Sequence, residues 1–185
     1  MKALIAYATT DGHTRIIARR IAEWIENGGA AAELVDTAAI PANFDVHDCD
    51  AYIIAGSVHA GKHQSSLVHF VKRNLKALEE KPSMFLSASL CCVIKDEEHA
   101  KEAEHCIGTF LDDTAWKPTV THPVEGALLY TQYDWLKRFM MKMISKSQGG
   151  TVDTSQDYEY TDWPALQKAV TDFMTANTAT AASPR

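Results

Sequence analysis

Short runs of apolar residues alternate along the chain with longer stretches in which apolar residues recur every three or four positions. The short runs are partly β-branched or aromatic and lack polar alternation, a pattern typical of strands that are covered on both faces in a parallel sheet. On this basis strands are predicted at residues 2–8, 32–37, 51–56, 83–88 and 119–129.

The longer stretches have the apolar spacing of amphipathic helices. In the first of them Ile17, Ile21 and Ile25 recur at helical spacing, and Asn27, Gly28 and Gly29 supply the stop. Helices are predicted at residues 14–26, 65–78, 97–112 and 161–174. Strands joined by helical crossovers predict an α/β fold with a doubly wound, five-stranded parallel sheet.

Composition places the chain among ordinary globular proteins. It has 185 residues, 46% hydrophobic and 23% charged, enough for one domain, which we assign to residues 1–176. Residues 177–185 lie in a stretch rich in Ala, Thr and Ser, and are expected to form a flexible tail. The net charge of -6 argues against non-specific nucleic-acid binding, so no nucleic-acid partner is expected.

Cysteine usage and hydropathy indicate the cytoplasm. None of the four cysteines is in a C-x-x-C arrangement, which excludes a zinc finger or a disulfide scaffold and favours a reducing compartment. The first apolar run is too short for a signal peptide. No stretch approaches the ~18 consecutive apolar residues of a membrane span.

The loop after the first predicted strand is rich in hydroxyl groups. It consists of Thr9, Thr10, Asp11, Gly12, His13 and Thr14. An open α/β sheet presents a helix N-terminus to ligands at this position, so the loop is predicted to bind an anion. It lacks the Walker lysine and the spaced glycines of a dinucleotide site, and its hydroxyls and backbone N–H groups suit a phosphate monoester instead. The alternative is a polar turn in which Asp11 or His13 caps the helix.

A family resemblance covers nearly the whole chain except the last ten or so residues. It is carried by Thr10-Asp11-Gly12-His13-Thr14-Arg15, by Gly56-Ser57-Val58-His59-Ala60-Gly61 with Phe70-Val71-Lys72, and by residues 133–150 with Asp153-Thr154 and Tyr160-Thr161-Asp162-Trp163. The first stretch resembles the phosphate loop of flavodoxins. The late block resembles, within that superfamily, the menaquinone-dependent protoporphyrinogen dehydrogenases of bacterial haem synthesis. The resemblance implies a flavodoxin-like strand order, 2-1-3-4-5, with FMN held by the first loop.

A phosphate on the first loop implies that the isoalloxazine ring lies beside the loops after the third and fourth strands. The remaining cofactor contacts are expected at Ser57, Val58, His59, Ala60, Gly61, Ser87, Ala88, Ser89 and Leu90. His59 and His63 are candidates for a hydrogen bond to the polar edge of the ring, and a solvated loop position is the alternative for each. Cys91 and Cys92 are expected to be buried small hydrophobes. Their loop offers no Tyr or Trp to stack on the flavin, which weakens the electron-carrier interpretation.

Other groups of polar residues do not indicate a metal site or a catalytic triad. His99, His105 and Cys106 lie on one predicted helix, but their spacing does not bring three ligands onto one face. No metal site is therefore predicted. No Ser-His-Asp arrangement stands out, and the sequence does not reveal a general base.

Residues 130–150 form a helical insert between the fifth strand and the last helix, too long for a simple βα loop. Residues 134–148 have the pattern of an amphipathic helix with four cations and one carboxylate, a net charge of +3. Its apolar side contains Trp135, Leu136, Phe139, Met140, Met143 and Ile144. Such a helix suits an anionic membrane interface, and a core helix with cations facing water is the alternative. The family resemblance favours the membrane, because a quinone acceptor is dissolved in lipid.

The resemblance therefore implies an FMN-dependent enzyme, peripheral on the inner membrane, that oxidises protoporphyrinogen IX and reduces a membrane quinone. Candidates for an aromatic wall against the porphyrin are Tyr130, Tyr133 and Trp135, and Lys137 and Arg138 are candidates for partners of its propionates. The alternatives are a flavodoxin-type electron carrier and a quinone reductase driven by NAD(P)H. The sequence does not indicate an oligomeric state.

Overall fold

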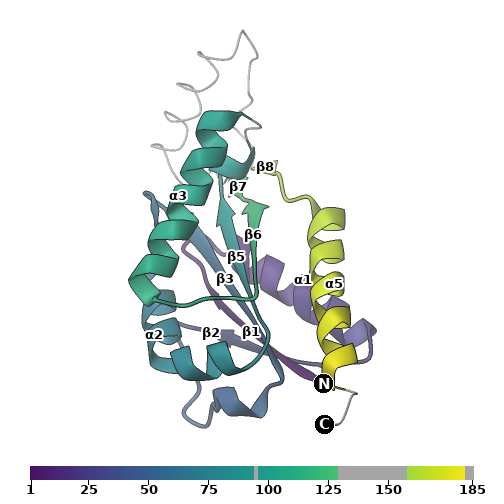
Figure 1. Ribbon diagram of the computed structural model, residues 1–185. Helices are drawn as coiled ribbons and strands as arrows, with labels where there is room; N and C mark the ends of the chain where they lie inside the picture. Colours follow the sequence, from purple (N-terminus) through teal and green to yellow (C-terminus); the bar gives the residue numbers. More distant parts are fainter. Residues whose placement is uncertain (94–95, 129–157, 182–185) are drawn as a thin grey trace.

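A twisted parallel sheet forms the centre of the computed structural model, which describes residues 1–93, 96–128 and 158–181 (Figure 1). The parallel strands are β1 (Lys2–Ala8), β2 (Ala31–Asp36), β3 (Ala51–His59), β5 (Ser83–Ser89) and β6 (Val120–Glu125). They lie in the order β2-β1-β3-β5-β6. The order expected from the flavodoxin resemblance is therefore confirmed, and a short strand β4 (Lys62–His63) adds to it by pairing antiparallel with β3.

Helices cover both faces of the sheet (Figure 1). The helices are α1 (His13–Asn27), α2 (Ser65–Glu80), α3 (Glu97–Thr114) and α5 (Trp163–Ala181), with 3-10 turns η1 (Val46–Asp48) and η2 (Cys91–Val93). Successive strand residues point to opposite faces, so Ile5 packs with the core under α1 and α5 while Leu4 packs with the core under α2 and α3. The two faces bury separate apolar clusters, as the uninterrupted apolar runs of the strands require.

The strand predicted at residues 119–129 is interrupted at Gly126. Its backbone N–H donates to the carbonyl of Ser89, 3.0 Å away, so the chain leaves the main sheet after Glu125. A Cβ atom at Gly126 would lie 3.2 Å from the Ser89 carbonyl carbon, closer than most residues tolerate. The following strand β7 (Ala127–Leu128) pairs antiparallel with β8 (Tyr158–Glu159) in a separate two-stranded sheet. The fifth strand predicted within residues 119–129 is thus present as β6, and it ends at Glu125 because a local close approach redirects the chain.

Two other boundaries differ from the predicted ones. β3 continues past residue 56 to His59 and turns back into β4 through Ala60 and Gly61, whose φ angles are 50° and 77°. Positive φ at both positions of a two-residue loop is the requirement of a tight hairpin turn. Helix α5 continues to Ala181, so it includes part of the stretch predicted as a tail.

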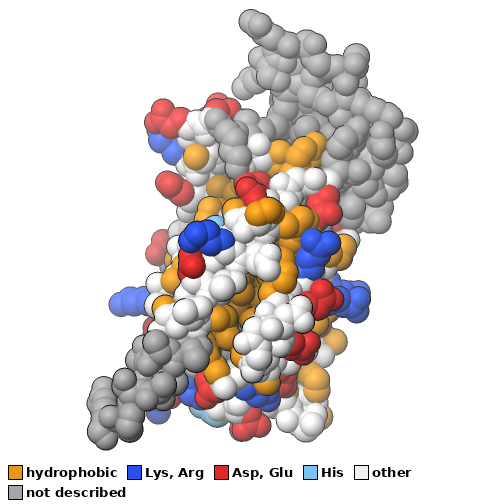
Figure 2. Space-filling view, turned by 90° about the vertical axis from the view of Figure 1, so that its right-hand side faces the viewer, with side chains coloured by type: hydrophobic (Ala, Val, Ile, Leu, Met, Phe, Trp, Pro, Cys, Tyr) orange, Lys and Arg blue, Asp and Glu red, His pale blue; other side chains and the backbone are white. Residues whose placement is uncertain are grey.

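The helical insert at residues 130–150 lies outside the described residues, and so do its candidates Tyr130, Tyr133, Trp135, Lys137 and Arg138. Among the described helices, none combines the length and the apolar character needed to cross a membrane. On the face seen in Figure 2, acidic and basic side chains are interspersed.

Candidate functional site

The loop after β1 opens directly onto the N-terminus of α1. Gly12 precedes the helix with a φ of 88°, a conformation that favours glycine, and its N–H donates to Thr9 Oγ1 at 2.9 Å. No side chain caps the helix, so the alternative in which Asp11 or His13 acts as a cap was wrong. The exposed Thr10 and Asp11 lie beside backbone N–H groups that a helix N-terminus leaves without intrahelical partners. This arrangement suits an anion.

Thr14 contributes a buried hydroxyl to the same place. The residue is 1% exposed, and its Oγ1 has no hydrogen-bond partner among the described residues. A buried hydroxyl without a partner costs about 1–3 kcal/mol. The first turn of α1 thus holds an unused donor next to its own N–H groups, which fits a phosphate group bound there.

His13 connects the loop after β1 to the segment before α5. Its Nε2 lies 2.9 Å from Thr161 Oγ1, and that hydroxyl donates to the backbone carbonyl of Glu125 at 2.9 Å. Because the single hydroxyl proton is committed to the carbonyl, His13 Nε2–H is the donor to Thr161. Burial lowers the pKa of His13, and the charge of Glu159 opposes this effect. His13 is therefore a neutral imidazole whose hydrogen bond to Thr161 helps to fix the loop.

Gln64 joins the phosphate loop to the end of β3 and was missed by the sequence analysis. Its Nε2 donates to Thr10 Oγ1 at 3.0 Å and to Ser57 Oγ at 2.7 Å. Its Oε1 is buried without a hydrogen-bond partner in the described part of the chain. The available signal was its position immediately before a predicted helix and after the third strand. Gln64 thus holds two predicted ligand-binding segments at a fixed separation.

A cavity of about 370 Å³ lies beyond these groups, between the hairpin that follows β3 and the loop that follows β5. Six predicted cofactor residues surround it: Val58, His59, Ala60, Gly61, Ser89 and Leu90. Helix α3 and η2 supply the remaining walls with Cys91, Glu98, His99, Glu102 and Cys106. The two loops expected beside the isoalloxazine ring therefore meet around one hollow.

Ser87 and Ala88 do not belong to this cavity. Both are buried in β5, which continues two residues beyond Ser87. They do not line the cavity with Ser89 and Leu90, because strand pairing with β3 and β6 continues through these positions. Their place among the cofactor contacts stays a prediction.

His63 is also in the interior, in contrast to both alternatives considered from sequence. It is 9% exposed, its ring lies between Phe85 and Phe110, and its Nε2 is 3.0 Å from Ser87 Oγ. Burial lowers its pKa to about 4, so the imidazole is neutral at pH 7. The hairpin reverses the chain after Gly61 and turns His63 into the core under α2 and α3.

The cysteines differ from expectation as well. Cys91 and Cys92 are half-buried in η2 instead of buried, and all four cysteines are free. Burial raises the pKa of Cys91 and of Cys106, so both thiols stay protonated. The Cys106 thiol points to the Gly61 carbonyl at 3.6 Å, a contact that fixes the hairpin tip against α3. Within the described residues no group of three side chains is placed to hold a metal ion.

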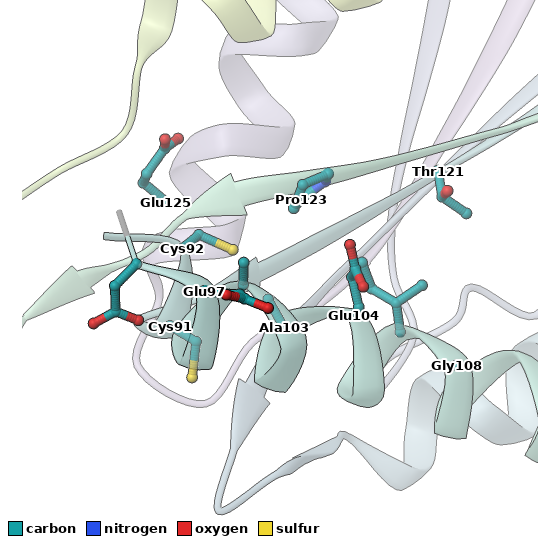
Figure 3. Close-up of a pocket in the computed structure, with 12 residues that line it drawn as sticks. Cys91, Cys92, Glu97, Ala103, Glu104, Gly108, Thr121, Pro123 and Glu125 are labelled. Atoms are coloured by element: carbon teal, nitrogen blue, oxygen red, sulfur yellow. The ribbon is translucent and has the colours of Figure 1, made fainter. Parts of the chain in front are cut away.

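A wider hollow of about 760 Å³ lies on the other side of η2, between α3 and the edge strand β6 (Figure 3). Its floor is largely apolar, and Asp96, Glu97, Glu104 and Glu125 stand around it. Cys91 lines both this hollow and the smaller cavity. The two spaces are thus neighbours at one end of the sheet.

The strand order, the hydroxyl-rich loop at the start of α1 and the cavity between the next two loops together define a flavodoxin-type α/β protein. The chain belongs to the flavodoxin domain family, whose family model matches residues 4–155. This membership indicates a flavin cofactor, and the unpartnered Thr14 hydroxyl at the N-terminus of α1 fits the phosphate end of such a group. The expected family is confirmed.

Two curated relatives are similar to this chain over most of its length. A protein of Escherichia coli K12 named protoporphyrinogen IX dehydrogenase [quinone] is 34% identical over 88% of this chain and 89% of its own length. A protein of Leishmania major with the same name is 29% identical over 93% of this chain and 74% of its own length. Among solved structures, an NADH:FMN oxidoreductase in its apo form has a TM-score of 0.56 at 11% identity, covering 95% of this chain and 90% of its own, and supports the fold alone.

Proposed function

We propose that this protein is an FMN-dependent protoporphyrinogen IX dehydrogenase that reduces a quinone. The similarity at 34% identity to a protein of that name over nearly the whole of both chains supports the reaction. The observation that carries the cofactor site is the buried, unpartnered hydroxyl of Thr14 beside an uncapped helix N-terminus.

The FMN phosphate would be held by the segment Thr9 to Thr14. Thr10 and Thr14 offer hydroxyl donors, and the first N–H groups of α1 add backbone donors and a favourable dipole. Thr9 contributes indirectly, because its hydroxyl accepts the Gly12 N–H and so fixes the loop. No cation is needed at this position, since hydroxyl and amide donors together suffice for a phosphate monoester.

The flavin ring would occupy the cavity of about 370 Å³. The residues that line it are aliphatic, polar or acidic, with no Tyr or Trp among the described lining residues to cover the ring. An uncovered ring suits an enzyme that must admit a flat macrocycle and then a quinone. The wider hollow beside Cys91 provides a neighbouring space for the macrocycle.

The bound flavin would supply hydride transfer, taking a hydride from the porphyrinogen and passing it to the quinone. This chain would bind both partners in turn. Tyr130, Tyr133 and Trp135 stay our candidates for an aromatic wall, and Lys137 and Arg138 for partners of the propionates. The basic amphipathic pattern of residues 134–148 favours a peripheral position on the inner membrane, where the quinone is dissolved.

Anaerobic mixing of the FMN-loaded protein with protoporphyrinogen IX, and separately with NADPH, tests the proposal. We expect protoporphyrinogen to bleach the flavin absorbance, NADPH to leave it unchanged, and a quinone to restore it. Bleaching by NADPH alone would indicate a quinone reductase. A stable one-electron form that does not react with quinones would indicate an electron carrier and would contradict the proposed enzyme.

A further inference from the structure

Asp96 and His99 form a bonded pair at the start of α3. Asp96 Oδ1 lies 2.7 Å from His99 Nδ1, and the same oxygen accepts the backbone N–H of His99 at 2.9 Å. Asp96 is the N-cap of the helix, so one carboxylate both starts α3 and orients the imidazole. Hydrogen bonds from His99 lower the pKa of Asp96 and keep it ionised. A carboxylate only accepts, so Nδ1 of His99 carries the proton in this contact.

The imidazole of this pair lines the cavity between the hairpin and the loop after β5. His99 is half-buried there. Gly61 and Leu90 line the same cavity, and each belongs to one of the two loops between which the flavin ring is expected. Because Nδ1 is committed to Asp96, Nε2 is the ring nitrogen left to meet a molecule in the cavity. An imidazole held at one nitrogen by a carboxylate is the arrangement of a general base.

We propose that Asp96 and His99 are the proton-transfer pair of this site, with His99 as the base and Asp96 as its positioning residue. The inference rests on the proposed function and adds the base that sequence analysis could not identify. Removing two electrons from a porphyrinogen breaks one C–H bond and one N–H bond. The bound flavin would take the hydride, the N–H electron pair would stay on the pyrrole nitrogen, and the proton would pass to His99 Nε2.

The return step balances the first. A quinone needs one hydride and one proton to become a quinol. The flavin would supply the hydride, and His99 Nε2 would give its proton to a quinone oxygen. Histidine suits both directions because it exchanges protons near neutral pH more readily than any other side chain. The ionised Asp96 stabilises the imidazolium that exists between the two steps.

Other titratable groups line the same cavity and are the alternatives to His99 as the base. They are Glu98 and Glu102 on α3, His59 at the end of β3, and the thiols of Cys91 and Cys106. The two thiols are kept protonated by burial. Among the lining groups, His99 is held by a carboxylate partner, Asp96, which fixes its ring orientation, and this distinguishes it from the two lining glutamates.

The test compares His99→Gln and Asp96→Asn with a control, His105→Gln, which alters an exposed histidine on the same helix. All proteins are loaded with FMN, and flavin reduction by protoporphyrinogen is followed from pH 5.5 to 8.5. We expect His99→Gln to slow reduction about 100-fold or more, the usual range for losing a general base, and to remove the histidine inflection from the pH profile. Asp96→Asn should slow reduction less, and His105→Gln should match the parent.

A second measurement does not depend on turnover. Nitrogen-15 NMR of the His99 ring in the FMN-loaded protein should show the Nδ1–H tautomer, and Asp96→Asn should shift it toward Nε2–H. Finding Nε2–H in the parent, or unchanged rate and pH profile in His99→Gln, would overturn the pair while the proposed reaction stands. A slowed Glu98→Gln or Glu102→Gln variant beside an unaffected His99→Gln would assign the base to that carboxylate. Failure of protoporphyrinogen to reduce the parent flavin would instead overturn the proposed function and, with it, this role.

Discussion

His13 Nε2 donates a hydrogen bond to Thr161 Oγ1 across 148 positions of sequence. Thr161 in turn donates to the Glu125 carbonyl at the end of β6, so the loop after the first strand is tied to the far edge of the sheet and to the approach to α5. The contact commits Nε2 of the histidine in this loop to a protein partner. It also makes the position of the phosphate loop depend on the C-terminal part of the chain.

Replacing Thr14 by Val should separate cofactor binding from stability. The hydroxyl is buried and unpartnered, so its removal should leave the flavin-free protein equally stable or stabilise it by up to about 1 kcal/mol. FMN affinity should fall about tenfold, since one buried hydrogen bond to the phosphate is lost. Urea unfolding of the apoprotein and fluorescence titration with FMN measure the two effects.

Thr114→Val is the matched control, because Thr114 is equally buried but its hydroxyl donates to the Phe110 carbonyl at 2.8 Å. This variant should lose stability and keep its FMN affinity. If Thr14→Val binds FMN as tightly as the parent, its hydroxyl is not a phosphate ligand.

Gln64 should matter for flavin binding through its hydrogen bonds to the phosphate loop and to the end of β3. Gln64→Ala removes the amide that holds Thr10 and Ser57, and FMN affinity should fall several-fold because the two segments are no longer fixed. Gln64→Glu should be worse than Ala, because a carboxylate cannot donate to both hydroxyls and repels a phosphate dianion. Isothermal titration gives the ranking parent, Ala, Glu; a Glu variant that binds as well as the parent contradicts it.

His63 should make the protein less stable as the solution is acidified. Its pKa is lowered from 6.5 to about 4 in the folded state, so below pH 6.5 the unfolded chain binds a proton that the folded chain does not. The free energy of unfolding should therefore decrease between pH 6.5 and 4, with a contribution from this residue of up to about 3 kcal/mol.

His63→Gln isolates that contribution, since Gln does not titrate and can still reach Ser87. The difference in unfolding free energy between parent and His63→Gln should shrink as the pH falls through this range. An exposed histidine on α2, His69, supplies the control, and His69→Gln should follow the pH dependence of the parent. A difference that stays constant from pH 7 to 4 would show that His63 is not held neutral.

The cations of the insert should decide membrane binding. Changing Lys137, Arg138 and Lys142 together to Gln should weaken binding to anionic vesicles by about 1 kcal/mol per cation, and added salt should mimic the change. Activity with a water-soluble quinone should survive, whereas activity with a long-chain quinone in vesicles should fall. The control removes three exposed cations of α2, Lys72, Arg73 and Lys76. Equal vesicle binding by the insert variant and the parent at low salt would refute the membrane role.

The sequence by itself determined which elements form and in what order they follow one another along the chain. The apolar runs of the strands and the helical spacing between them are local patterns, and the structure has a parallel strand near each predicted one and a helix near each of the four predicted outside the insert. The phosphate loop was found in the same way, because a hydroxyl-rich turn between a buried strand and a helix needs no knowledge of distant residues. The family resemblance added the strand order, which local patterns do not contain.

Only the tertiary structure decided which side chains face the site. His63 was expected at the polar edge of the flavin ring or in a solvated loop, but a two-residue turn at Ala60 and Gly61 folds it into the core against Ser87. Gln64 binds Thr10 across 54 positions of sequence, a contact that no local pattern encodes. Asp96 and His99 are close in sequence, yet the place of His99 in the cavity between the hairpin and the loop after β5 follows from how α3 packs beside the hairpin. Local periodicity determines which elements form, whereas the direction of each polar side chain depends on partners that only the folded chain brings within hydrogen-bond distance.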